Sequence, residues 1–567
     1  MAFCESPQMN HRSTPKPASI LGATLVSLLS AAVPAQAQAD PADPPVAPPA
    51  TEAPSAPEPA AEPPPLAPAP QAPAPVEPAP TPPEEGPPPE AATEPAAEAR
   101  ASAGASLEID PPRPVAAPPP AEASAKAAPP EATAATAPLT LSVGEGERAL
   151  SVTFYGFVQA DYIYDTTRSF DEWIGPHLVE RTDTYDGTVG RTQFSTRNTR
   201  FGLFFTAPSI GGVRPTAVLE GDFFGNQPAS AHEGSFYDSP TFRLRHAFVS
   251  VKTDYIDVVL GQTYDVFGWQ NTFFPASAEL LPLPAQVFSR RPQFRLSRSF
   301  GADGPVGVTI AAAAARPAQR DAEIPDVNGG LLFTLNDWKG ITTPGNIGTR
   351  ATPLSLGISG VVRQFKVDAF TPPPTQTSNE ALGWGLSVDA LLPVIPADDA
   401  SDRGNRLTLL GSFVTGTGVG DLMNTLGGAS FPTLPNPAQA NPPPEYHGNI
   451  DPGLVSFDTQ GVLHSIDWQG FRVGAQYYLP PSGRFIIAAN YTQAHSRNLD
   501  ELFPQGGAEI ELLVRVADRT RYADVSLFWD AMPFLRFGLG GSYTWVEYLD
   551  GDDPHNLRAK AQAVYLF

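Results

Sequence analysis

The stretch Arg558-Ala559-Lys560-Ala561-Gln562-Ala563-Val564-Tyr565-Leu566-Phe567 decides how the rest of the chain is interpreted. Its alternate residues form one apolar face, and polar residues lie between them: Arg558, Lys560 and Gln562. Alternation with a period of two predicts a β-strand with one apolar side and one side that faces water. An aromatic residue at the end is typical of the closing strand of bacterial outer-membrane barrels, where Tyr565 and Phe567 would contact the barrel-assembly machinery. A half-buried terminal strand of a soluble sheet is the alternative.

The same alternation returns throughout residues 151–567, for example in Val525, Leu527 and Trp529. Sixteen strands are expected, at 151–165, 193–207, 213–225, 241–253, 255–265, 289–300, 304–316, 327–338, 354–370, 381–394, 403–416, 471–480, 483–495, 520–530, 533–548 and 556–567. Strands of a barrel face lipid with only every second residue, so a mean hydropathy of -0.16 is compatible with a membrane protein. The sequence therefore predicts an all-β fold, a transmembrane antiparallel β-barrel of about sixteen strands.

The connections between these strands alternate in length, as short turns and longer outer loops of such barrels do. The long ones are 166–192, 226–240, 266–288, 371–380, 417–470, 496–519 and 549–555. The short ones are 208–212, 253–254, 301–303, 480–482 and 531–532. The alternation holds if 460–468 is a hairpin arm within its long loop rather than a wall strand. The connection 339–353 is longer than a short turn, and the sequence offers no reason for it.

The part of the chain before the barrel has a different composition. Residues 1–39 have the charged, apolar and small-residue layout of a secretory signal peptide, and the single cysteine, Cys4, lies within it. Residues 40–150 are expected to form a disordered periplasmic tether, because 40–138 hold nearly half of the 67 prolines. This segment either contacts peptidoglycan or is a solvated tail. Beyond residue 39 no apolar run is long enough for a membrane-spanning helix. A net charge of -24 argues against nucleic-acid partners.

Five pieces of the stretch 154–300 resemble the DcaP-like family of trimeric outer-membrane porins. In order they are Tyr155-Gly-Phe-Val-Gln-Ala-Asp161, Leu219-Glu-Gly-Asp-Phe-Phe-Gly225, Arg243-Leu-Arg-His-Ala-Phe248, Leu260-Gly-Gln-Thr263 and Arg290-Arg-Pro-Gln-Phe-Arg295. The resemblance implies a homotrimer in outer-membrane lipid that passes small, often anionic solutes such as dicarboxylates. It also implies a coiled-coil extension, from which this chain departs because 40–138 are rich in proline and have no heptads.

Strand alternation places a group of arginines on the lumen side. Phe242, Leu244 and Phe248 are expected on the lipid side, which turns their neighbours inward. The inward arginines are Arg200, Arg243, Arg245, Arg291 and Arg295. Arginine stays charged and its fork matches carboxylate oxygens, so such a cluster favours anions. Glu220 and Asp222 also face the lumen, on the strand between, and the alternative is a wall whose charges neutralise one another.

Residues 266–288 follow the fifth strand, where porins of this size fold a loop into the pore. Asp265 and Glu279 are the acidic residues expected to face the arginines. An ordinary extracellular loop is the alternative.

These observations predict passive diffusion of small hydrophilic, anionic solutes through an outer-membrane porin, with no cofactor, no metal and no catalytic residue. An acidic group at Asp550, Asp552, Asp553 and Asn556 is compatible with a divalent cation but fits turn chemistry better. Two other functions stay open. One is an anchor that ties the outer membrane to the cell wall through 40–138, and the other is an outer-membrane hydrolase.

Overall fold

The computed structural model describes residues 139–144, 149–174, 179–226, 233–318, 322–368, 378–424, 453–457, 462–502 and 516–567. The predicted signal peptide and most of the predicted tether lie outside these residues. No helix among the described residues is both long and apolar enough to cross a bilayer.

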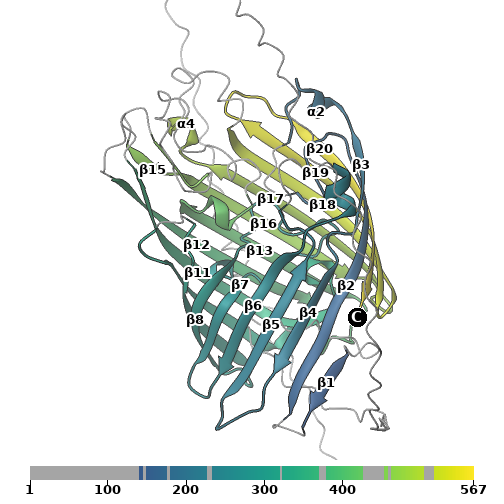
Figure 1. Cartoon of the computed structure of the whole chain (residues 1–567). Coiled ribbons are helices and arrows are strands. Elements are labelled where there is room, and N and C mark those ends of the chain that lie inside the picture. Colours follow the sequence, from purple (N-terminus) through teal and green to yellow (C-terminus); the bar gives the residue numbers. More distant parts are fainter. Residues whose placement is uncertain are drawn as a thin grey trace, which may run out of the picture. The chain divides into compact units, whose positions relative to one another are not determined.

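Within the described residues the chain forms a closed antiparallel β-barrel with sixteen strand positions, as predicted (Figure 1). The strands are β2 (Leu150–Asp165), β3 (Arg191–Ser195), β4 (Arg200–Thr206), β5 (Arg214–Asp222), β6 (Arg243–Lys252), β7 (Asp257–Tyr264), β8 (Arg290–Phe300), β9 (Val306–Ala315), β10 (Asp326–Thr342), β11 (Arg350–Asp368), β12 (Ser378–Ile395), β13 (Arg406–Thr417), β16 (Asp467–Tyr478), β17 (Phe485–Ser496), β18 (Ala517–Met532), β19 (Leu535–Tyr548) and β20 (His555–Leu566). β3 and β4 share one position, because they pair with successive parts of β2.

The predicted closing strand closes the barrel. β20 pairs with β19 on one side and with β2 on the other, in a register that runs from Phe157 opposite Leu566 to Asp165 opposite Arg558. Phe567 continues this ladder, since its amide and carbonyl both bond Gly156 at 3.1 Å. Because each of the sixteen wall positions is paired on both sides, the described part of the barrel wall has no free edge strand.

Side chains alternate across the wall as the sequence predicts. On β20, Leu557 and Tyr565 are 52% and 49% exposed on the outside, whereas Arg558 is 1% exposed on the inside. The prediction for Phe248 is wrong: it is buried against Val218 and Val259 instead of facing lipid. A register shift between Glu220 and Gly221 in the β5–β6 pairing inserts one extra residue, which reverses the alternation along β6.

Shorter elements lie in the connections: α2 (Tyr185–Thr188), α3 (Glu233–Asp238), α4 (Leu499–Leu502), η2 (Phe267–Trp269), η3 (Pro344–Asn346) and η4 (Gly420–Leu422). β14 (Val455–Phe457) and β15 (Leu463–Ser465) form a separate two-stranded sheet, so 460–468 contain a hairpin arm, as expected. β1 (Thr140–Val143) was expected within the disordered tether, but it pairs with β2. Its alternating Leu141 and Val143 suit a strand that extends the sheet beside the start of β2.

Candidate functional site

The connection between β7 and β8, residues 265–289, folds into the lumen, and we name it the constriction loop. Near its start the Gly268 amide donates to Ser359 Oγ at 2.7 Å, and Trp269 Nε1 donates to the Ile358 carbonyl at 3.2 Å. Trp269 and Phe273 are buried among lumen-facing residues of the wall, including Leu332 and Leu391. Burial of these two aromatic side chains stabilises the inward position of the loop.

The middle of the constriction loop reaches the opposite wall. Arg472 of β16 donates to the Phe273 carbonyl at 2.8 Å, and Asn490 of β17 donates to the Ala276 carbonyl at 2.8 Å. The Ala278 amide donates to Ser526 Oγ of β18 at 2.9 Å. The loop therefore spans the lumen from β7 to β18, and the alternative of an ordinary extracellular loop is wrong.

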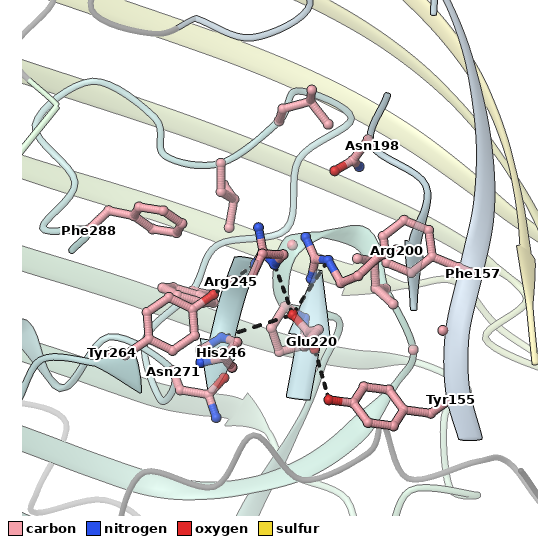
Figure 2. A pocket seen from close by; sticks show the side chains of 18 of the residues that line it. Tyr155, Phe157, Asn198, Arg200, Glu220, Arg245, His246, Tyr264, Asn271 and Phe288 are labelled. Carbon is pink, nitrogen blue, oxygen red and sulfur yellow. Dashed lines mark hydrogen bonds and ion pairs between the residues drawn. The ribbon is translucent and has the colours of Figure 1, made fainter. Parts of the chain in front are cut away.

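Three of the predicted arginines lie together on the wall that the loop leaves open, as Figure 2 shows for two of them. Arg245 Nε donates to Glu220 at 2.8 Å and its Nη1 to Asp222 at 2.9 Å. Arg243 forms two hydrogen bonds to Asp222, at 2.9 and 2.8 Å. Arg200 Nε lies 3.7 Å from Glu220, and Glu220 also accepts a 3.0 Å hydrogen bond from the Tyr155 hydroxyl. We name Arg200, Arg243, Arg245, Glu220 and Asp222 the arginine cluster.

The arginine cluster combines the two alternatives that the sequence leaves open. Three guanidinium groups share two carboxylates, so the cluster is partly neutralised and keeps an excess of positive charge. Arg200 Nε is a buried donor for which the described residues contain no hydrogen-bond acceptor. A buried donor without a partner is a place where an anionic oxygen gains a bond without displacing one.

The other predicted residues lie apart from this cluster. Arg291 pairs with Asp265 at 2.7 Å and with Asp326, which also accepts a 2.8 Å bond from Arg363 of β11. Arg295 bonds Gln293 and the Tyr264 carbonyl and is almost fully buried. These two arginines of β8 are therefore enclosed within the wall and the loop, and they do not line the opening that Arg245 lines.

Glu279 occupies a different wall from the one expected. Its carboxylate accepts a 2.9 Å hydrogen bond from Ser542 of β19 and lies 3.5 Å from Arg558 of β20. The expectation that it faces the arginine cluster is therefore wrong. The loop crosses the whole lumen, and its length before Glu279 carries this residue past the cluster to the far side.

A cavity remains between the arginine cluster and the constriction loop. It is lined on the wall side by Tyr155, Arg200, Glu220, Arg243, Arg245 and Tyr264, and on the loop side by Asn271, Phe274, Leu281 and Phe288. Arg350 and neighbouring residues of the β10–β11 connection line it as well. Four arginines and one glutamate therefore border the cavity, among aromatic faces.

Sequence reasoning did not select Arg290 and Arg350 as site residues. Arg290 lies over the rings of Tyr264 and Phe288, at 5.7 and 5.2 Å from their centroids, although strict alternation would turn it outward. Its place beside Arg291, where the loop meets the strand, is the feature of the sequence that could have indicated this inward position. Arg350 follows the connection between β10 and β11, whose path no periodic pattern in the sequence predicts.

The acidic group near the end of the chain has protein partners. Arg181 forms bonds of 3.0 and 2.8 Å to Asp550, and Thr182 donates to Asp552 at 2.9 Å. Asn556 donates to Asp165. Among the described residues no cluster of His, Cys, Asp and Glu has the geometry to hold a metal ion.

Comparison with protein-family models and with curated proteins finds no match. Comparison with solved structures finds the outer membrane channel DcaP of Acinetobacter baumannii, at 15% identity and a TM-score of 0.51, over 75% of this chain and 100% of that one. OmpT of Vibrio cholerae matches at 10% identity and a TM-score of 0.41, over 75% of this chain and 100% of that one. An anion-selective porin from Comamonas acidovorans matches at 11% and 0.39, over 74% and 100%. Only the first superposition is close enough to show a shared chain path. This chain therefore has the fold of the DcaP-like outer-membrane channels, as its sequence motifs indicated.

Proposed function

We propose that this protein is an outer-membrane porin through which small hydrophilic anions, dicarboxylates among them, diffuse passively. The observation that carries the proposal is the cavity beside the constriction loop, where four arginines and one glutamate face the lumen. Fixed positive charge in a narrow, partly dehydrated passage attracts anions and repels cations. Rings of Tyr155, Tyr264 and Phe288 between the charges suit solutes that carry carboxylates on a short hydrocarbon chain.

The outer membrane is the location that the barrel fits. Its outside carries exposed apolar and aromatic residues on alternate positions of the strands, and its inside is polar. A homotrimer and a contact of 40–138 with peptidoglycan are further parts of the proposal. Chemical cross-linking in detergent and a peptidoglycan pull-down with and without 40–138 test these two parts separately.

The proposal is tested by recording single channels of the mature protein in planar bilayers under a KCl gradient. The expected result is a stable conductance whose zero-current potential has the sign of the chloride equilibrium potential. Arg200→Gln and Arg243→Gln are expected to move this potential toward zero, because each removes one charge from the cavity wall. Arg298→Gln is the control, since Arg298 lies on β8 beside Asp254 and Phe300, away from the cavity.

A second arm asks about the solute. A short dicarboxylate added to one side is expected to interrupt the chloride current, whereas a diol of the same length is not. Cation preference in the first arm would overturn the arginine argument, and a folded barrel that passes no ions would overturn the porin itself.

A further inference from the structure

The connection between β10 and β11 has an unusual path, and we name residues 339–353 the inner hairpin. A register shift between Leu335 and Lys339 interrupts the β10–β11 ladder, after which pairing resumes from Lys339 opposite Pro353 to Thr342 opposite Arg350. The ladder thus continues past a bulge as a short two-stranded arm. Bulges bend the strands that carry them, and this one redirects the arm away from the wall.

The arm lies inside the barrel. The Ile341 carbonyl accepts a 3.0 Å hydrogen bond from Thr408 of β13, and the Thr343 amide donates to Gln476 of β16 at 2.9 Å. Ile341 is fully buried against Tyr478, Ile486 and Phe528, which face the lumen from β16, β17 and β18. The inner hairpin therefore crosses from β10 and β11 to the opposite wall.

One arginine of that wall holds the tip of the inner hairpin. Arg536 of β19 donates to Thr343 Oγ1 at 2.5 Å and to Thr349 Oγ1 at 3.3 Å, so it bonds both ends of the tip. Asp530 accepts a 2.6 Å hydrogen bond from Arg536 and also pairs with Arg403. Bonds from a charged donor that is itself fixed by a carboxylate hold a segment more firmly than neutral ones do.

The tip also meets the constriction loop. The Gly345 amide donates to the Pro275 carbonyl at 2.9 Å, and Arg350 Nη2 donates to the Asn271 carbonyl at 2.6 Å. On the other side the tip faces the cavity, which Pro344, Ile347 and Thr349 line together with Arg350. Two segments that enter the lumen between different strands thus form one continuous partition.

We propose that the inner hairpin is a second constriction element, which closes the half of the lumen beneath the constriction loop and sets the width of the remaining passage. The passage then runs between the hairpin tip and the arginine cluster, with Arg350 as an additional selectivity residue opposite Arg200 and Arg245. This inference rests on the proposed pore function. It gives a role to the connection 339–353, whose length the sequence does not explain.

The first test places a single cysteine at the tip. In a Cys4→Ala background, Ile347→Cys is treated with a negatively charged methanethiosulfonate reagent while single-channel current is recorded. The expected result is a loss of roughly half of the current or more, because a bulky anionic group then occupies the passage. Asp303→Cys is the matched control: it lies in an exposed turn between β8 and β9 at the same end of the barrel, where modification leaves the current unchanged.

The second test shortens the hairpin by replacing residues 343–349 with Asn-Gly. A roughly twofold larger conductance and weaker anion preference are expected, since the tip no longer narrows the passage and Arg350 loses its position. If the shortened chain does not fold, the cysteine experiment alone decides.

If the parent protein conducts but modification at residue 347 does not change the current, the second constriction is wrong and the pore function stands. A parent protein that folds and does not conduct would instead count against the pore function itself.

Discussion

Two halves of the same barrel use inward arginines in opposite ways. On the wall formed by β4, β5 and β6, Arg200, Arg243 and Arg245 face a cavity and share Glu220 and Asp222. On the wall formed by β16 to β20, the inward arginines Arg472, Arg536 and Arg558 bond the segments that fill the lumen or the loops around it. In both halves the arginines lie on strands and point into the barrel. Only in the second half does a protein segment lie in front of them.

The difference lies in what the guanidinium groups meet. In the covered half they donate to backbone carbonyls, such as that of Phe273, and to hydroxyls of the inner hairpin. Arg536 and Arg558 also pair with the carboxylates of Asp530 and Asp165, so their hydrogen bonds both hold protein segments in place and balance charge. In the open half their partners are carboxylates of the same wall, and the positive charge in excess of these carboxylates borders the cavity. Under the proposed function, an inward arginine acts on selectivity only where no protein segment crosses in front of it.

The largest expected effect tests the structural role of the covered half. Arg558 is fully buried and binds Asp165 through bonds of 2.7 and 2.8 Å. Arg558→Ala leaves the Asp165 carboxylate buried without its counter-charge, so unfolding in urea is expected to show a loss of about 3–5 kcal/mol. Arg298→Ala on β8 is the control and is expected to lower stability by less than about 1 kcal/mol. Equal losses of stability in the two variants would show that the Arg558–Asp165 pair does not stabilise the barrel more than an ordinary surface residue does.

An effect of intermediate size is expected on ion selectivity, which should change when a carboxylate is removed from the open half but not from the covered half. Glu220→Gln removes one of the two carboxylates that the three cluster arginines share, so the anion-to-cation permeability ratio is expected to rise roughly twofold. Glu279→Gln makes the same chemical change in the covered half and is expected to leave the ratio unchanged. Zero-current potentials under a KCl gradient measure both. A rise for Glu279→Gln as large as that for Glu220→Gln would mean that both halves are open to ions.

The smallest expected effect lies outside both halves, in the loops. Burial raises the pKa of the Asp550 carboxyl, but the hydrogen bonds and the charge of Arg181, together with backbone hydrogen bonds such as that from Asp552, outweigh burial and leave the pKa below its usual value. A lowered pKa stabilises the fold above the ordinary pKa of about 4, and this contribution is lost as the pH falls through the lowered value.

Asp550→Asn is therefore expected to cost less than about 1 kcal/mol at pH 7, because the pair is near the surface, and less still at pH 2, where the carboxyl is closer to its protonated form. Thermal unfolding at the two pH values checks this, with Asp553→Asn as the control. A cost that persists unchanged at pH 2 would contradict the assignment to the Asp550 carboxylate.

Local pattern was sufficient for most of the fold. Alternation along β20 and β18 predicted which side of each strand faces lipid, and the lengths of the connections predicted a hairpin arm outside the wall, which is found as β14 and β15. It failed at Phe248, because one inserted residue reverses the inward and outward sides and leaves no mark in composition. It failed at Glu279 because a loop position does not say how far across the lumen the loop extends.

The sequence by itself determined that the chain forms a barrel with a polar inside, because each strand position carries its own signal of lipid or water. It also determined that arginines line that inside. Tertiary structure alone decided which of them border a cavity. The constriction loop and the inner hairpin cover one wall and leave the other open, and this depends on contacts between residues far apart in the chain, such as Gly345 with Pro275 and Arg536 with Thr343.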